Sequence, residues 1–308
     1  MQLEGIHHVT AITGDAPRNV DFYARLLGLR LVKKTVNFDA PDVYHLYYGD
    51  DQGASGSILT FFEFPGAAPG RHGAGMIHTL RWRVAGGAAL DFWAERLAVE
   101  SVAAERDGDA LRFEDPEGLR LELAAVSRPD APLVAAAADI PAEHALLGFD
   151  GVRAYAADPG RSADLLEQAL GFGAIGDGDY EAAGEQRRAS YSYDSPPADP
   201  GVQGAGSVHH IAWSSADDAE QMRWRERLSE HGAHPTPLID RTYFHSIYFR
   251  EPSGVLFELA TRGPGFAVDE PADRLGETLA LPPQHEHMRE RLERTLTPLS
   301  NPCRTAAG

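Results

Sequence analysis

The chain has 308 residues, of which 43% are hydrophobic and 24% are charged, a composition typical of a soluble globular protein with about two domains. The formal net charge of −18 argues against binding to nucleic acid or to an anionic membrane surface, so we expect small molecules as partners. A single cysteine, Cys303, excludes an intramolecular disulfide, and the sequence lacks a signal-like or membrane-spanning apolar run, so we expect a cytoplasmic protein.

The first predicted element is a short apolar strand at residues 5–10, which carries the neighbouring histidines His7 and His8. Apolar residues at helical spacing then predict a helix that begins near Pro17 and ends before Gly28. Three segments rich in β-branched and aromatic residues follow, and they predict strands over 31–38, 44–48 and 57–62. The first unit therefore has the order βαβββ.

This unit recurs three more times along the chain. A shift of 70 residues aligns His8 with His78, a shift of 143 aligns it with Gly151, and a shift of 202 aligns it with His210. Such internal similarity is the signature of a duplicated structural module. We therefore predict an α+β fold of four βαβββ modules, arranged as two halves of two paired modules each.

The ends of the modules are less uniform than their beginnings. The second and fourth modules close with similar strands that carry Glu122 and Glu258, 136 positions apart. The third is the weakest copy, because its last strand is expected to dissolve into the stretch 195–206, which is rich in proline and glycine.

Linker composition sets the predicted boundaries. A segment rich in proline and alanine at 126–147 predicts the connection between an N-terminal half at 1–130 and a C-terminal half at 148–263. The remaining residues, 264–308, form a C-terminal extension in which 282–299 predict a short amphipathic helix. This helix is expected to pack against the body or against a neighbouring subunit, so a homo-oligomer stays open.

Two histidines and one glutamate on three predicted strands are the candidate metal ligands: His8, His210 and Glu258. A carboxylate in a hydrophobic strand needs a partner, because burying it unpaired is costly. Two imidazoles and one carboxylate are the usual ligands of a mononuclear metal site with open coordination positions. The alternative is a pair of hydrogen-bonded core histidines beside an ion-paired glutamate, but the duplicated context favours the metal site.

The paired modules resemble the vicinal oxygen chelate superfamily, in which such modules form open, mixed-sheet cups around a metal. More narrowly, four segments are similar to ring-cleaving dioxygenases that open hydroquinones, including chlorinated ones: GIHHVTAIT at 5–13, LRLVKKTVNF at 29–38, YHLYYG at 44–49 and VHHIAW at 208–213. The resemblance extends to about Gly263. It implies an extradiol-type enzyme that uses iron(II), with manganese(II) as the second choice, and that opens a hydroquinone-type ring, substituted or halogenated, with O₂.

The resemblance also implies roles for individual residues. The metal ligands of that family match His8, His210 and Glu258. Arg241 and Tyr248 match residues beside the metal, where they would stabilise negative charge on an oxygen atom. Further positions around the metal match His7, Thr10 and His209, and the two histidines could move protons. Without the resemblance, Tyr248 reads as a packing residue and Arg241 as a solvent-exposed one.

Strand alternation constrains these roles. Successive side chains of a strand point to opposite faces, so Thr10 shares a face with His8, whereas His7 and His209 begin on the other face. A role for these two histidines at the metal therefore needs a bend in the strand or a relay.

The second module carries residues that could form a second metal centre. His78 and Glu122 occupy the aligned ligand positions of the second module. The third module offers Gly151 in place of a histidine and no terminal glutamate, which favours a vestigial site.

Two other functions compete with the dioxygenase. A glyoxalase-like isomerase or lyase would use the metal only as a Lewis acid, and it usually needs a second carboxylate at the ion, where the first module has Thr60. A non-catalytic small-molecule-binding protein is the third reading, which loss of the ligand triad would favour.

Overall fold

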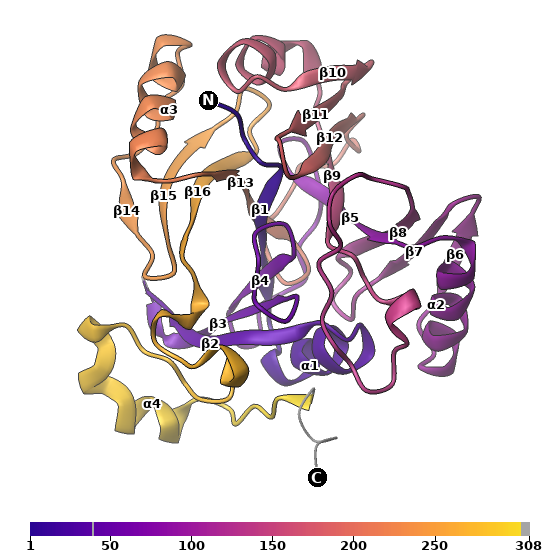
Figure 1. Ribbon diagram of the computed structural model, residues 1–308, viewed down its shortest axis with the longest axis vertical. Helices are drawn as coiled ribbons and strands as arrows, with labels where there is room; N and C mark the ends of the chain where they lie inside the picture. The colour runs from indigo at the N-terminus through magenta and orange to yellow at the C-terminus, as the bar shows by residue number, and fades with distance from the viewer. Residues whose placement is uncertain (39, 303–308) are drawn as a thin grey trace.

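The computed structural model describes residues 1–38 and 40–302, and Cys303 lies outside them. Two eight-stranded mixed sheets lie side by side and carry helices on their outer faces (Figure 1). The predicted α+β fold is confirmed, because each of the four modules has a strand, a helical segment and three further strands. Within the described residues, no helix has the length and apolar character needed to cross a membrane.

The first sheet combines the first and fourth modules in the order β14-β15-β16-β13-β1-β4-β3-β2. Its strands are β1 (Ile6–Thr13), β2 (Arg30–Asn37), β3 (Ala40–Gly49), β4 (Ile58–Glu63), β13 (Val208–Ser215), β14 (Ile239–Asp240), β15 (Phe244–Arg250) and β16 (Leu256–Pro264). The first strands of the two modules, β1 and β13, pair antiparallel at the centre, and each also pairs in parallel with the last strand of its own module.

The second sheet combines the second and third modules in the order β10-β11-β12-β9-β5-β8-β7-β6. Its strands are β5 (Ile77–Val84), β6 (Ala104–Asp107), β7 (Ala110–Glu114), β8 (Arg120–Ala125), β9 (Phe149–Tyr155), β10 (Gly173–Gly176), β11 (Asp179–Ala183) and β12 (Arg188–Asp194). The expected loss of the third module's last strand is wrong: β12 pairs with both β9 and β11, and it ends at Asp194, before the proline- and glycine-rich stretch begins.

Each sheet therefore takes one module from the segment 1–130 and one from the segment 148–263. Modules that are neighbours in sequence lie in different sheets, and the pairing of β1 with β13 joins strands about 200 residues apart in the chain. This pairing is what brings the two histidine pairs close together.

Helical segments link the first and second strands of the modules. They are α1 (Ala16–Val20) with the π-helical η1 (Asp21–Leu26), α2 (Gly87–Val99), η3 (Pro159–Ser162) with the π-helical η4 (Asp164–Ala169), and α3 (Asp218–Glu230). The Asp15 side chain accepts a hydrogen bond from the Arg18 N–H and caps α1, which explains why the helix begins there. The short η2 (Ala142–His144) lies in the linker between the segments.

The two faces of the first sheet have different partners. Val9 and Trp213 belong to the main core, which also contains Trp93 of α2 and Trp224 of α3. Alternation places Ala212 on the opposite, concave face, in a smaller buried cluster that also contains Tyr47. The concave face therefore forms the inside of a cup, as the resemblance implied.

The C-terminal extension packs against the body, beside β2 and β3 (Figure 1). It contains η5 (Phe266–Val268), η6 (Ala272–Arg274), η7 (Pro283–Met288) and α4 (Arg289–Thr295), the helix that the sequence predicted. The Ala280 N–H donates to the Lys34 carbonyl at 2.9 Å, and Leu292 of α4 is fully buried. The extension thus covers the free edge of β2.

Candidate metal centre

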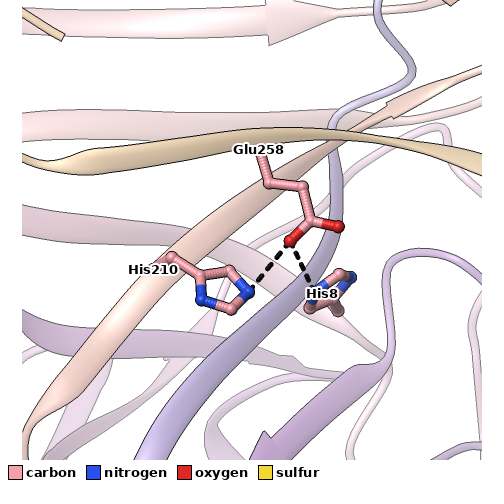
Figure 2. Close-up of side chains that lie close together, drawn as sticks. All are labelled: His8, His210 and Glu258. Carbon is pink, nitrogen blue, oxygen red and sulfur yellow. Dashed lines mark ion pairs between the residues drawn. The ribbon is translucent and has the colours of Figure 1, made fainter. Parts of the chain in front are cut away.

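His8, His210 and Glu258 converge on the concave face of the first sheet, from β1, β13 and β16 (Figure 2). One ligand atom from each lies within 4.8 Å of the other two. Glu258 Oε2 is 2.9 Å from His210 Nε2 and 3.3 Å from His8 Nε2. Among the described residues, no other group of three or more His, Cys, Asp or Glu side chains has this arrangement.

The donor set of this cluster fits a divalent cation. Glu258 is 0% exposed, and Ser246 Oγ donates a hydrogen bond to its Oε1, which leaves Oε2 directed at the two imidazoles. Oε2 has no hydrogen-bond partner of good geometry among the described residues, although both Nε2 atoms are close. Three donor atoms that converge without a well-aligned hydrogen between them are what a metal ion would satisfy.

The electrostatics of the cluster favour its deprotonated form. Burial opposes the charge of the Glu258 carboxylate, but the neighbouring His8 and His210 outweigh it and hold the pKa of that carboxyl well below its ordinary value. Burial also lowers the pKa of His210. An ionised carboxylate and a neutral imidazole are the protonation states that metal ligation requires.

His7 and His209 reach the cluster through the bend and the relay that alternation demanded. The pairing of β1 with β13 skips both residues, so each lies at a β-bulge that turns its side chain out of the regular alternation. His7 Nδ1 is 2.9 Å from His8 Nδ1, and His209 Nδ1 is 2.7 Å from His210 Nδ1. Each of the two candidate histidine ligands therefore has another histidine as the hydrogen-bond partner of its Nδ1.

The contact between His7 and His8 is compatible with metal ligation by His8 Nε2. Burial lowers the pKa of His7 to about 3, so this imidazole is neutral near pH 7 and carries a single N–H. With His8 Nδ1–H as the donor to His7 Nδ1, the lone pair of His8 Nε2 is free to face the cluster.

A cavity of about 310 Å³ opens beside the cluster. It is lined by His8, Thr10, Asn37, Phe38, His45, Tyr47, Phe62, Phe64, His209, His210, Arg241, Phe244, Tyr248 and Leu256. The structure thus brings Thr10, His209, Arg241 and Tyr248 together with the candidate ligands, as the resemblance implied. His7 instead lines a separate cavity of about 470 Å³, which Phe244 also borders.

Arg241 and Tyr248 act as a pair at the wall of this cavity. Arg241 Nε donates to the Tyr248 hydroxyl at 3.1 Å, and the guanidinium lies 5.3 Å from the centre of the Tyr248 ring. Burial, together with the charge of Glu258, raises the pKa of Tyr248, so its hydroxyl stays protonated. The register places Tyr248 directly opposite Glu258 on β15 and β16, which explains why Tyr248 lies on the same face of the sheet as the candidate ligands.

Sequence reasoning missed several residues of the site. His45 and Tyr47 lie two residues apart on the same face of β3, and both line the cavity. The alternation of the predicted strand at 44–48 already placed their side chains together, but only the pairing of β3 with β4 shows that they face the cluster. Phe244 packs against His8 with a centroid distance of 4.9 Å.

The second sheet shows why the first repeat alignment was off by one residue. The pairing of β5 with β9 skips His78, as the pairing of β1 with β13 skips His7. His78 is therefore the counterpart of His7, and Thr79 stands at the position of His8. A sequence shift cannot reveal this, because the bulge that fixes the register appears only when the partner strand is known.

On the second sheet, the face that corresponds to the candidate metal centre is filled by ion pairs. The Glu122 carboxylate accepts from Arg81 Nε at 2.6 Å and from Arg112 Nε at 2.8 Å, while His78 Nε2 contacts Asp194 at 2.9 Å. A Cβ atom at Gly151 would lie 1.9 Å from Ser190 Oγ, so no histidine fits there without movement. A larger cavity of about 1240 Å³ adjoins these pairs, but its lining lacks a converging ligand set, so we place the candidate centre in the first cup.

A family model for the "Glyoxalase/Bleomycin resistance protein/Dioxygenase superfamily" matches residues 5–123 and 148–259, which is more than two thirds of the chain. The chain belongs to this superfamily. The matched ranges contain all four modules and all three candidate ligands. The resemblance that the sequence motifs suggested is thereby confirmed.

Two relatives that match nearly the whole chain are named as dioxygenases. The chain is 42% identical over 302 residues to MhqO of Bacillus subtilis, a protein named for ring-cleaving dioxygenase activity, with 96% of each chain covered. It is 34% identical over 319 residues to the chlorohydroquinone/hydroquinone 1,2-dioxygenase of Sphingobium indicum, again with 96% of each covered.

Solved structures agree with the fold. A Bacillus subtilis protein crystallised under the name of a dioxygenase superposes with a TM-score of 0.91 at 40% identity, and the match covers 97% of this chain and 98% of that one. Glyoxalase I of Zea mays superposes with a TM-score of 0.61 at 16% identity, covering 84% of this chain and 92% of that one, a likeness of fold alone.

Proposed function

We propose that the chain is an iron(II)-dependent, extradiol-type dioxygenase that opens a hydroquinone-type ring with O₂. The observation that carries this proposal is the convergence of two imidazole nitrogens and one carboxylate oxygen beside a cavity with aromatic walls. The names of the relatives, which include a hydroquinone dioxygenase, support the substrate class. A cytoplasmic location and self-association stay predictions from the sequence.

His8, His210 and Glu258 would hold the metal ion through Nε2, Nε2 and Oε2. Two histidines and one carboxylate on one face of an ion suit iron(II) and leave positions for further ligands. Bound there, iron(II) would supply coordination sites for a ring hydroxyl and for dioxygen and would overcome the spin barrier between them.

The remaining residues act on the organic substrate. The aromatic walls, among them Phe62 and Phe244, match a flat ring, and they exclude water from it. The Tyr248 hydroxyl accepts from Arg241, so its own hydrogen points elsewhere and can be donated to a negatively charged oxygen of the substrate. Arg241 adds a positive charge at the same wall.

His209 is the better placed of the two bulge histidines to exchange protons with the substrate. It lines the cavity, and burial lowers its pKa to about 4, so it is a neutral imidazole near pH 7 that can accept a proton. His7 lines the other cavity, and its Nδ1 contacts His8 Nδ1 at 2.9 Å. We assign His7 the orientation of His8 rather than proton transfer.

The competing isomerase function would need a second carboxylate at the ion. The register places Thr60 of β4 opposite Thr10, as it places Glu258 of β16 opposite Ala212. A threonine in that place cannot act as a carboxylate base, so the first cup favours oxygen chemistry over isomerisation.

Oxygen uptake tests the proposal. The protein is purified without oxygen, its metal content is measured, and it is assayed in an oxygen electrode with a panel of hydroquinones and catechols. We expect about one iron(II) per chain, as a single three-ligand site requires, and oxygen consumption that depends on a hydroquinone. Turnover of a glyoxalase-type substrate in the absence of oxygen, with no compound drawing down oxygen, would contradict it.

A further inference from the structure

A chain of four hydrogen-bonded side chains ends at the wall of the candidate site. The Tyr47 hydroxyl is 2.9 Å from His45 Nδ1, and His45 Nε2 is 2.8 Å from Thr60 Oγ1. Thr60 Oγ1 in turn lies 3.1 Å from Thr10 Oγ1. All four side chains are buried, so bulk water does not compete for these hydrogen bonds.

The direction of donation follows from the end at Thr10. Thr60 Oγ1 donates its one hydrogen to Thr10 Oγ1, so in its bond with His45 Nε2 the threonine accepts. A neutral imidazole with its hydrogen on Nε2 accepts at Nδ1. Tyr47 therefore donates to His45 Nδ1.

The rest of the chain is then fixed. Burial lowers the pKa of His45 well below its ordinary value, so the imidazole is neutral and its single N–H is on Nε2. Nε2–H donates to Thr60, and Thr60 donates to Thr10. The Thr10 hydroxyl accepts this bond, and its own hydrogen is left for a partner in the cavity.

Thr10 lines the cavity two strand positions from His8 and directly opposite His210 in the β1–β13 register. A donor at this place faces the same cavity as His8 and His210, the residues that would hold the metal. It would act from a different strand than Tyr248.

We propose that Tyr47, His45 and Thr60 are positioning residues that hold the Thr10 hydroxyl as a hydrogen-bond donor to an ionised ring oxygen of the substrate. This inference rests on the proposed hydroquinone site. It assigns no covalent step to the four residues. Their effect is to favour the ionised form of the bound phenol, because a fixed donor stabilises an anion more than it stabilises a neutral hydroxyl.

The matched variants are Thr60→Val, which keeps the shape of the side chain and removes the hydroxyl, and Thr60→Ser, which keeps the hydroxyl. The full chain is loaded with zinc(II), a metal that His and Glu also ligate, and titrated without oxygen with nitrohydroquinone, whose visible absorbance reports its ionised form. We expect Thr60→Val to lower the ionisation constant of the bound probe about tenfold, whereas Thr60→Ser stays within about twofold of the unmodified protein.

Tyr47→Phe, which removes the first donor of the chain, is the second variant if Thr60→Val does not fold, and it should change the ionisation constant in the same direction. An unchanged constant in a folded Thr60→Val or Tyr47→Phe protein overturns the inference, as does failure of the probe to ionise in the unmodified protein. Because zinc(II) supports no oxygen chemistry, absence of oxygen uptake by the iron(II) protein would contradict the proposed function and leave this result standing.

Discussion

Replacing His210 with alanine is expected to abolish metal retention while the protein stays folded. His210 contributes one of three ligand atoms, so its loss should weaken iron(II) binding by more than about 100-fold, since even residues that only support a ligand contribute 10- to 100-fold. The side chain lies on the concave face, outside the main core, so unfolding free energy should change by less than about 2 kcal/mol. Metal analysis after gel filtration and a denaturant titration measure the two effects.

His78 provides the matched control for this experiment. It is a buried strand histidine of the second module, and it contacts Asp194. Its ring stacks on that of Tyr155 with a distance of 3.8 Å between the ring centroids. His78→Ala should retain iron(II) as the unmodified protein does. Equal metal loss in the two variants would indicate a general effect of removing a buried histidine and would contradict the assigned ligand.

Replacing Lys33 with methionine is expected to destabilise the protein by about 3–5 kcal/mol, because it leaves two carboxylates without their buried counter-charge. Lys33 is 0% exposed, and its Nζ donates to Asp269 Oδ1 at 2.5 Å and also to Glu270. Both carboxylates belong to the C-terminal extension, so this one cation ties the extension to β2. The free energy of unfolding in denaturant measures the loss.

A double variant separates the charge effect from the lost packing. Lys33→Met combined with Glu270→Gln removes one of the two uncompensated charges, so it should recover part of the lost stability. A double variant that is less stable than Lys33→Met alone would contradict this account.

Tyr243 connects the ion pairs of Lys33 to the candidate metal centre. Its hydroxyl donates to Asp269 at 3.0 Å, and the next residue in the sequence, Phe244, lines the cavity. The single variant should therefore also weaken substrate binding.

The ligand triad could be predicted because duplication leaves a visible trace. His8 and His210 stand in similar apolar contexts, and a buried strand glutamate such as Glu258 needs a partner whatever the fold. Both features are visible in the local sequence alone. The pairing of β1 with β13 then brings the three residues together, as a shared site requires.

The features that depend on strand register could not be predicted. The bulge at His7 takes this residue out of the strand register, so that its neighbour His8 is the candidate ligand. The bulge at His78 has the same effect in the second module, where Thr79 stands at the position of His8. The role of His45 depends on Thr60 of the next strand, which no local pattern identifies. Arg81 and Arg112 fill the second cup through contacts across strands, so Glu122 looks like a ligand only when it is read alone.

The central claim is that residues 8, 210 and 258 share one iron ion. The most direct test is a crystal structure of the iron(II)-loaded protein with anomalous diffraction measured at the iron edge. The account predicts one strong anomalous peak within about 2.0–2.2 Å of Nε2 of His8, Nε2 of His210 and a carboxylate oxygen of Glu258, the usual range for nitrogen and oxygen ligands. An iron peak bound elsewhere, or one that lacks any of these three contacts, would contradict it.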